Sequence, residues 1–304
     1  MRPRSSPTER ALLLSQGGPF AAQFLKALST KPQLEIENVI LQCLFRRRLR
    51  LPLVDGLCTC PARSHGSGKR MYTTAVALDE YGDHLASCMR TGRVQRRANV
   101  LEKIWMQIFE EAGGTLVPNE KLRNMRIGVD VEDKRRVEFA VYNLKFGPPL
   151  LCDATQVSPL DQNGNPHPKC AVEAAGAAFE VAEKRKTNTY REAAQAAGRI
   201  VLVTLACEIG GRWSDTCIKW VGMLAKYKAH NEPPHLKRAV EFAWHSRWWS
   251  LLSVAAQRTF ALSLIEVDSD AIKPLADFEP RVGDILADVR YELGPVLSRL
   301  PLRG

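Results

Sequence analysis

Two acidic residues and one lysine have the types and spacing needed to hydrolyse a phosphodiester bond. Glu138 lies in the segment RVEFAV (136–141), Asp153 lies in LLCDAT (150–155), and Lys186 ends the basic run KRK (184–186). Such hydrolysis needs groups that hold a divalent metal, hydroxide formed on that metal, and a cation that offsets the charge of the phosphorane. Two carboxylates and a lysine supply the first and the last of these.

Both carboxylates adjoin apolar residues, where a charge is costly unless something compensates it. If the two segments are neighbouring strands, Glu138 and Asp153 project to the same end of one sheet, within reach of one hard cation. Each carboxylate alone is better explained as a strand-edge charge in solvent. The pair, with a lysine on a following helix, instead predicts a catalytic Mg²⁺ or Mn²⁺ site with Lys186 as the transition-state cation.

Three further charged residues are weaker candidates for this site. Glu102 on the preceding helix and Glu120 after the first expected strand are possible additional ligands, although surface helices are rich in glutamate. Lys184 is an alternative to Lys186, because two residues separated by two positions on a helix cannot both face one site.

A second group of residues has the chemistry of a structural zinc site. Its four expected ligands are Cys58, Cys60, His84 and Cys88. His and Cys at i and i+4 share a helical face, and four ligands leave no open position for catalysis. The surrounding segment holds little apolar material with which to fold unaided, which favours metal over chance placement of ordinary cysteines. His65 is a spare ligand.

The charge pattern favours nucleic acid as the partner. The chain of 304 residues has a net charge of +10 and a pI near 9.3. Clustered basic side chains release counterions from phosphates, whereas each cluster alone could equally be a solvated helix face. The clusters expected to contact DNA are Arg93, Arg96 and Arg97, and then Lys134, Arg135 and Arg136.

Other classes of protein fit the composition less well. No stretch approaches the roughly 20 apolar residues of a membrane span, and the polar first ten residues lack a signal-peptide core. Eight cysteines in a chain of this length, several in apolar contexts, do not indicate a disulfide framework. We therefore expect a protein that is nuclear or cytoplasmic, not secreted and without a membrane partner.

The elements that must position these residues follow from hydrophobic periodicity. A helix is expected over 95–112, strands over 115–117, 136–142 and 150–157, a helix over 172–186, a strand over 199–207, and helices over 215–228 and 236–264. This order predicts an α/β fold. Trp244 and Trp248 share a face with leucines of the last helix, which favours core packing over base stacking.

The expected domain organisation has five parts. They are a helical lead-in (1–51), a CCHC zinc knuckle (52–94), a nuclease core (95–213), a helical extension packing on the core (214–265) and a loosely packed tail (266–304).

Taken together, these motifs resemble a known family. The CCHC residues, Arg96 and Arg97, Glu120, the strands around Glu138 and Asp153, and Lys186 ahead of Tyr190 occur in the order seen in restriction-like endonuclease regions of non-LTR retrotransposon polyproteins. The similarity covers about residues 51–211 and extends to the expanded copies of such elements in dinoflagellate genomes.

The resemblance implies a restriction-endonuclease-like mixed sheet flanked by helices, of the PD-(D/E)xK type, preceded by a CCHC knuckle. It places Glu138 at the first acid of the motif, Asp153 at the second acid, and Lys186 at a lysine displaced onto the following helix, with Tyr190 completing its context. Two departures stand out, since Glu138 replaces the usual aspartate and Thr155 stands where standard members carry lysine.

Two functions of different classes follow. The first is a metal-dependent endonuclease that nicks target DNA, with element RNA as a further partner. The alternative is a catalytically degenerate module that binds nucleic acid through the knuckle and the basic clusters; a weaker third reading is a non-functional genomic relic.

Overall fold

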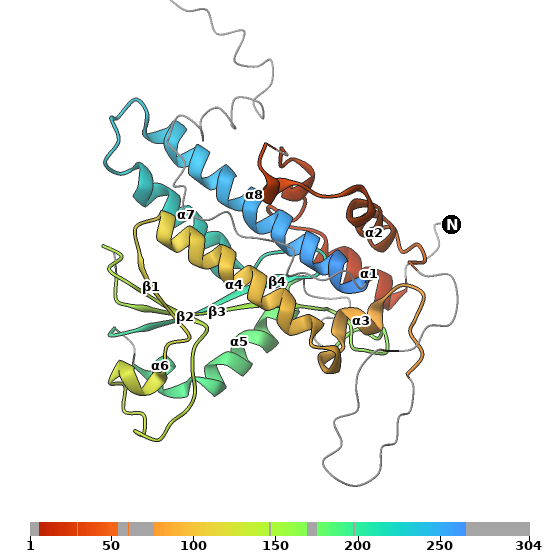
Figure 1. Ribbon diagram of the computed structural model, residues 1–304, viewed down its shortest axis with the longest axis horizontal. Helices are drawn as coiled ribbons and strands as arrows, with labels where there is room; N and C mark the ends of the chain where they lie inside the picture. Colours follow the sequence, from red (N-terminus) through yellow and green to blue (C-terminus); the bar gives the residue numbers. More distant parts are fainter. Residues whose placement is uncertain are drawn as a thin grey trace, which may run out of the picture.

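A four-stranded mixed sheet lies at the centre of the protein (Figure 1). The computed structural model describes residues 6–28, 30–53, 60, 76–145, 147–168, 175–196 and 198–265. The strands are β1 (Thr115–Pro118), β2 (Phe139–Tyr142), β3 (Leu150–Val157) and β4 (Val201–Glu208), in the order β1-β2-β3-β4. β2 is antiparallel to both β1 and β3, and β4 is parallel to β3. The α/β class predicted from the sequence is confirmed.

The second strand is shorter than expected, because it begins at Phe139 and not at residue 136. The residues before it pair with the loop that follows β1. Val137 N–H donates to the Glu120 carbonyl at 2.9 Å, and Asn119 N–H donates to the Glu138 carbonyl at 2.7 Å. β2 therefore covers β3 only over the three residues from Leu150 to Cys152.

Two long helices, α4 (Arg93–Glu111) and α7 (Asp215–Ala229), contact one face of the sheet. The longest helix, α8 (Lys237–Leu264), packs on both of them. α4 places Trp105, Ile108 and Phe109 in the core at spacings typical of one helical face, and all three are fully buried. Trp244 and Trp248 of α8 are also buried, so the expectation that they pack in the core is confirmed.

The opposite face of the sheet carries α5 (Ala177–Thr189) and α6 (Arg191–Gln195) (Figure 1). A smaller apolar cluster joins them to the sheet. Its members include Ala140, Leu151, Tyr190, Ala193 and Ile200. This cluster holds the C-terminal end of α5 against β3, where the candidate catalytic residues lie.

The N-terminal segment packs against α8 as separate short helices. It contains α1 (Pro7–Ser15) and α2 (Asn38–Arg48), with 3-10 turns at Gln23–Leu25 and Pro32–Leu34, and was expected to be more continuously helical. A close backbone contact ties it to the end of β4. A Cβ at Gly210 would lie 2.5 Å from the Ser15 carbonyl carbon, so only glycine fits there.

Two remaining expectations concern the C-terminal tail and a membrane-spanning helix. The expected tail (266–304) lies outside the described residues. Among the described helices, none combines the length and apolar character needed to cross a bilayer.

Candidate functional site

The register of β2 and β3 brings the two predicted carboxylates together. Phe139 pairs with Cys152, so Glu138 lies opposite Asp153 one step beyond the last ladder pair. Residues opposite each other in an antiparallel pair project to the same face. The Glu138 carboxylate accepts a hydrogen bond from Ala154 N–H at 2.6 Å, which ties its side chain to the backbone of β3 where the ladder ends.

Lys186 and Tyr190 complete the surroundings of Asp153. The Lys186 ammonium nitrogen lies 2.5 Å from each Asp153 carboxylate oxygen and donates a hydrogen bond to Oδ2. The Tyr190 hydroxyl lies 3.2 Å from the same Oδ2 and 3.0 Å from the Arg136 carbonyl oxygen. Lys186 and Tyr190 are four residues apart and share a helical face, so the end of α5 presents both to Asp153.

Burial makes this group electrostatically unusual. Asp153 is 1% exposed and the Lys186 side chain is 18% exposed. Burial and the neighbouring Asp153 carboxylate raise the pKa of Glu138 to about 8. Burial, again followed by the charge of Asp153, raises the pKa of Glu102. Glu102 of α4 therefore belongs to the same electrostatic group as the two strand carboxylates.

The donor set suits a hard divalent cation, but its geometry is incomplete. Asp153 Oδ1 is buried, and its contact among the described residues is the Lys186 ammonium, which a metal at this oxygen would displace. Carboxylate oxygens are the ligands that Mg²⁺ and Mn²⁺ prefer. However, the carboxylates of Glu102, Glu138 and Asp153 do not all lie within 4.8 Å of one another. The three carboxylates therefore do not form one closed set of ligands.

The structure does not bring Glu120 or Lys184 to this group. Glu120 Oε1 accepts hydrogen bonds from Lys121 N–H and from the Asn124 side chain, at 3.1 and 2.7 Å. Lys184 is exposed on α5, whereas Lys186 is half-buried against Asp153. Of the two lysines, Lys186 is the one that contacts the site.

Two of the arginines expected to bind DNA are directed inward. Arg93 donates to the Ser263 carbonyl at 2.6 Å, and Arg97 donates to the Ala86 carbonyl at 2.6 Å and lies over the Phe260 ring. They are 7% and 1% exposed. For these two the expectation of phosphate contact is wrong, because both side chains anchor the start of α4 to α3 (Asp83–Ser87) and α8.

The remaining members of the two clusters differ from one another. Arg135 is held by Asp133, Glu192 and the Thr189 carbonyl, so it braces α5 and α6 against the loop before β2. Arg96, Lys134 and Arg136 have exposed side chains.

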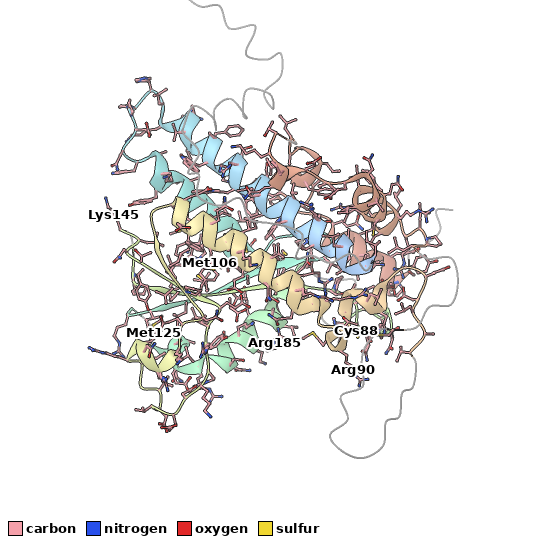
Figure 2. All side chains as sticks on the ribbon, in the orientation of Figure 1. Cys88, Arg90, Met106, Met125, Lys145 and Arg185 are labelled. Carbon is pink, nitrogen blue, oxygen red and sulfur yellow. The ribbon has the colours of Figure 1, made fainter. Side chains whose placement is uncertain are left out.

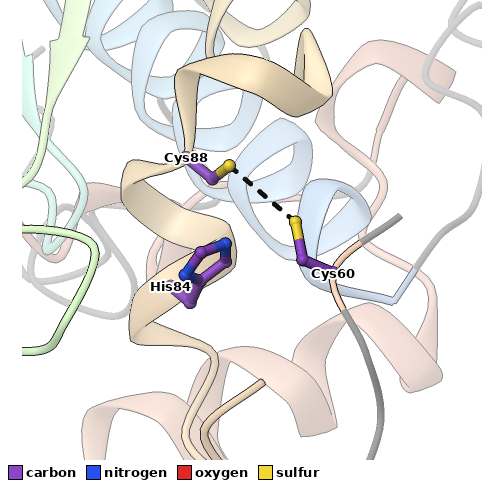
Figure 3. Close-up of side chains that lie close together, drawn as sticks. All are labelled: Cys60, His84 and Cys88. Carbon is purple, nitrogen blue, oxygen red and sulfur yellow. Dashed lines mark hydrogen bonds between the residues drawn. The ribbon is translucent and has the colours of Figure 1, made fainter. Parts of the chain in front are cut away.

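The zinc prediction falls on three described residues that converge. One ligand atom each from Cys60, His84 and Cys88 lies within 4.8 Å of the others, and no other such group of three occurs among the described residues. The two sulfur atoms are 3.9 Å apart and the His84 ring faces the space beside them (Figure 3). This group could hold a metal ion. The fourth expected ligand, Cys58, and the spare ligand His65 lie outside the described residues.

The hydrogen bonds of His84 leave one of its ring nitrogens available to a metal such as zinc. Its Nδ1 lies 3.1 Å from the Gln162 carbonyl oxygen, while its Nε2 is buried and has no partner among the described residues. A metal-ligating histidine typically donates its other ring N–H to a carbonyl or carboxylate, which fixes the tautomer. The donors are two sulfurs and one imidazole nitrogen, a set that suits zinc.

Sequence reasoning missed the acidic residues that support this group. Asp79 accepts backbone N–H bonds from Tyr81, Asp83 and His84 at 2.7–3.0 Å. Asp83 is buried and pairs with Arg47 and Arg50 of the N-terminal segment. An aspartate followed by a glycine and a second aspartate, DEYGD (79–83), is a turn signal that could have identified them.

Comparison with known proteins does not assign the chain to a family. No family model matches the chain, and no curated protein matches its sequence.

Proposed function

We propose that the protein is a metal-dependent DNA endonuclease with a restriction-endonuclease-like core, related to the nuclease regions of non-LTR retrotransposons. The observation that carries the proposal is the ion pair between Lys186 and Asp153, from the two elements that the motif requires. The order α4-β1-β2-β3-α5-β4 and the opposition of Glu138 to Asp153 support it.

Each residue has a distinct role in this proposal. Glu138 and Asp153 would hold Mg²⁺ or Mn²⁺, which would supply Lewis acidity and lower the pKa of a bound water. The Lys186 ammonium, already beside Asp153, turns toward the scissile phosphate and offsets the charge that develops there. Tyr190 holds Asp153 through Oδ2, so the carboxylate keeps its orientation when the lysine moves.

Zinc has a separate, structural role. Cys60, His84, Cys88 and Cys58 would form a closed four-ligand site, which leaves no coordination position for substrate. The knuckle is anchored to the rest of the protein through Asp83, which pairs with arginines of the N-terminal segment.

A plasmid-nicking assay tests the nuclease. Wild-type protein with Mn²⁺ should relax supercoiled plasmid, while Asp153→Ala and Lys186→Ala should not. Lys184→Ala removes an exposed lysine of the same helix and should nick like wild type. Circular dichroism establishes that each variant is folded. Metal-dependent nicking retained by folded Asp153→Ala and Lys186→Ala would reject the assignment of the site.

The alternative function is nucleic-acid binding without hydrolysis. It is favoured by the incomplete convergence of the three carboxylates. This function predicts DNA affinity that falls steeply with salt, and no cleavage with any divalent metal.

A further inference from the structure

A pocket of about 500 Å³ opens beside the candidate site. Part of its wall is formed by Thr155, Gln156 and Val157 of β3. β2 pairs with β3 only up to Cys152, so this half of the strand has β4 alone as its described ladder partner. Thr155 follows Asp153 by two residues and lies on the same face of β3, which places the pocket next to Asp153 along the strand.

The remaining walls come from α5, the region of α3, the start of α4 and the loop after β3. α5 contributes Ala178, Val181, Ala182 and Arg185, and the region of α3 contributes Ala86, Ser87 and Met89. Figure 2 labels Arg185 on α5 and Cys88 just after α3, which identify the two elements that contribute these residues. Ser87 hydroxyl donates to the Leu160 carbonyl at 2.8 Å, which fixes this wall against the loop after β3.

Apolar side chains at this pocket remain in contact with water. Met89 is 65% exposed and Val181 is 51% exposed. Folding gains little from side chains left in this position, and apolar surface around a concave site often marks a binding function. Together they offer apolar surface to a flat ring entering the pocket.

Buried polar groups without partners are also part of the pocket wall. Arg97 Nε, a donor, and Gln156 Oε1, an acceptor, are buried and make no hydrogen bond among the described residues. Their residues are only 1% and 3% exposed. Leaving such groups unpaired is unfavourable, and both belong to residues that line the pocket.

We propose that this pocket receives an unpaired nucleobase from the strand that the site at Asp153 would cleave. The inference rests on the proposed function, because it takes nucleic acid as the substrate. A base has two apolar faces and an edge with both donors and acceptors. Arg185 is exposed at the pocket and carries a positive charge for the adjoining phosphates. An aliphatic side chain of a protein partner would bring no anion to Arg185.

Binding measurements without added Mg²⁺ or Mn²⁺ test this inference apart from cleavage. The probe is a DNA duplex with a single bulged 2-aminopurine, compared with the same duplex fully paired. Wild-type protein should bind the bulged duplex about tenfold more tightly. The fluorescence of the bulged 2-aminopurine should change on binding, and that of a paired 2-aminopurine should not.

A filled pocket provides the matched variant. Ala182→Leu places three additional carbons at the pocket wall and should abolish the preference for the bulge while retaining affinity for paired duplex. Ala194→Leu makes the same change at an exposed position of α6 and should retain the preference. Equal affinity of wild-type protein for both duplexes, with unchanged fluorescence, would overturn the inference.

The outcomes separate the two proposals. Nicking of plasmid without preference for the bulge leaves the nuclease intact and removes the base pocket. Preference for the bulge without nicking supports the pocket and rejects hydrolysis. Loss of the preference in Ala194→Leu as well as in Ala182→Leu would show that the effect does not come from the pocket.

Discussion

Removing Lys186 should destabilise the protein through the charge that it leaves behind. Asp153 is 1% exposed and its only described cationic partner is Lys186, while the Tyr190 hydroxyl bond remains after the substitution. Removing one partner of a buried ion pair costs about 3–5 kcal/mol. A hydrogen bond to a charged group retains about 1.5–3 kcal/mol of this. We therefore expect Lys186→Met to lower the free energy of unfolding by about 2 kcal/mol, the difference between the centres of these two ranges.

A double-mutant cycle isolates the interaction. Asp153→Asn removes the charge and keeps the shape, so the double variant Asp153→Asn/Lys186→Met contains neither ion. Its loss of stability should be smaller than the sum of the two single losses by about 2 kcal/mol. Urea unfolding at neutral pH, followed by circular dichroism, measures all four free energies. Lys184→Met, at an exposed position of the same helix, should stay within about 0.5 kcal/mol of wild type.

The cycle has a clear negative outcome. If the single losses add to within about 0.5 kcal/mol, Lys186 and Asp153 do not interact in solution. The ion pair that carries the proposed function would then be absent, and the roles assigned to both residues would fail with it.

Three further perturbations test other features of the structure. Burial raises the pKa of Glu208 to about 7, and Arg212 opposes the shift. The stabilising contribution of Glu208 is therefore present below about pH 4.3 and is lost as the pH rises through 7. Glu208→Gln should therefore be more stable than wild type at pH 8, by about 1–3 kcal/mol, and closer to it at pH 4.5; equal urea midpoints at both pH values would contradict this. His84→Ala should remove bound zinc and lower the melting temperature, whereas His235→Ala, at an exposed histidine, should leave one zinc per chain by elemental analysis. Glu111→Ala leaves Arg247 and the Trp248 indole N–H without their carboxylate and should lower the free energy of unfolding in urea by about 3 kcal/mol. Glu111→Gln should lower it by less. Equal losses in the two variants would show that the carboxylate oxygens are not the partners.

The central pattern of the site could be predicted because it depends on local rules. An aspartate within a run of buried apolar residues identifies a strand position whose charge needs a partner. Lys186 and Tyr190 are four apart on a helix, which requires only helical geometry to bring them to one face. The pairing of the strands was also accessible from the order of elements, and it placed Glu138 beside Asp153.

The arginines of α4 show where the same reasoning was incomplete. Arg93 and Arg97 continue at intervals of four the stripe formed by Leu101 and Trp105. That spacing places them on the buried face, and their long side chains reach backbone carbonyls there. Periodicity contained this signal, but residue type alone suggested DNA contact. Charge on a helix is informative only after its face is known.

Other features depend on contacts between distant segments and have no local signature. The late start of β2 accompanies bonds between the preceding residues and the loop around Glu120, and it leaves one edge of β3 open. Arg47 and Arg50 belong to a basic run that resembles a DNA contact, yet they pair with Asp83 and hold α3 in place. Neither arrangement could be read from spacing along the chain.

The two ends of α5 contact different features of the protein. Its C-terminal end, with Lys186 and Tyr190, meets the buried carboxylates. Ala182, one turn before Lys186, and Ala178, two turns before it, border the pocket. The opposite wall of the pocket comes from α3, whose His84 belongs to the metal-ligand group. A metal at that group would therefore order the pocket wall directly, whereas α3 reaches the carboxylates through α4 and β3. A structural rather than a catalytic role for the cysteines and the histidine therefore predicts that loss of this metal disturbs base binding before it disturbs the ion pair.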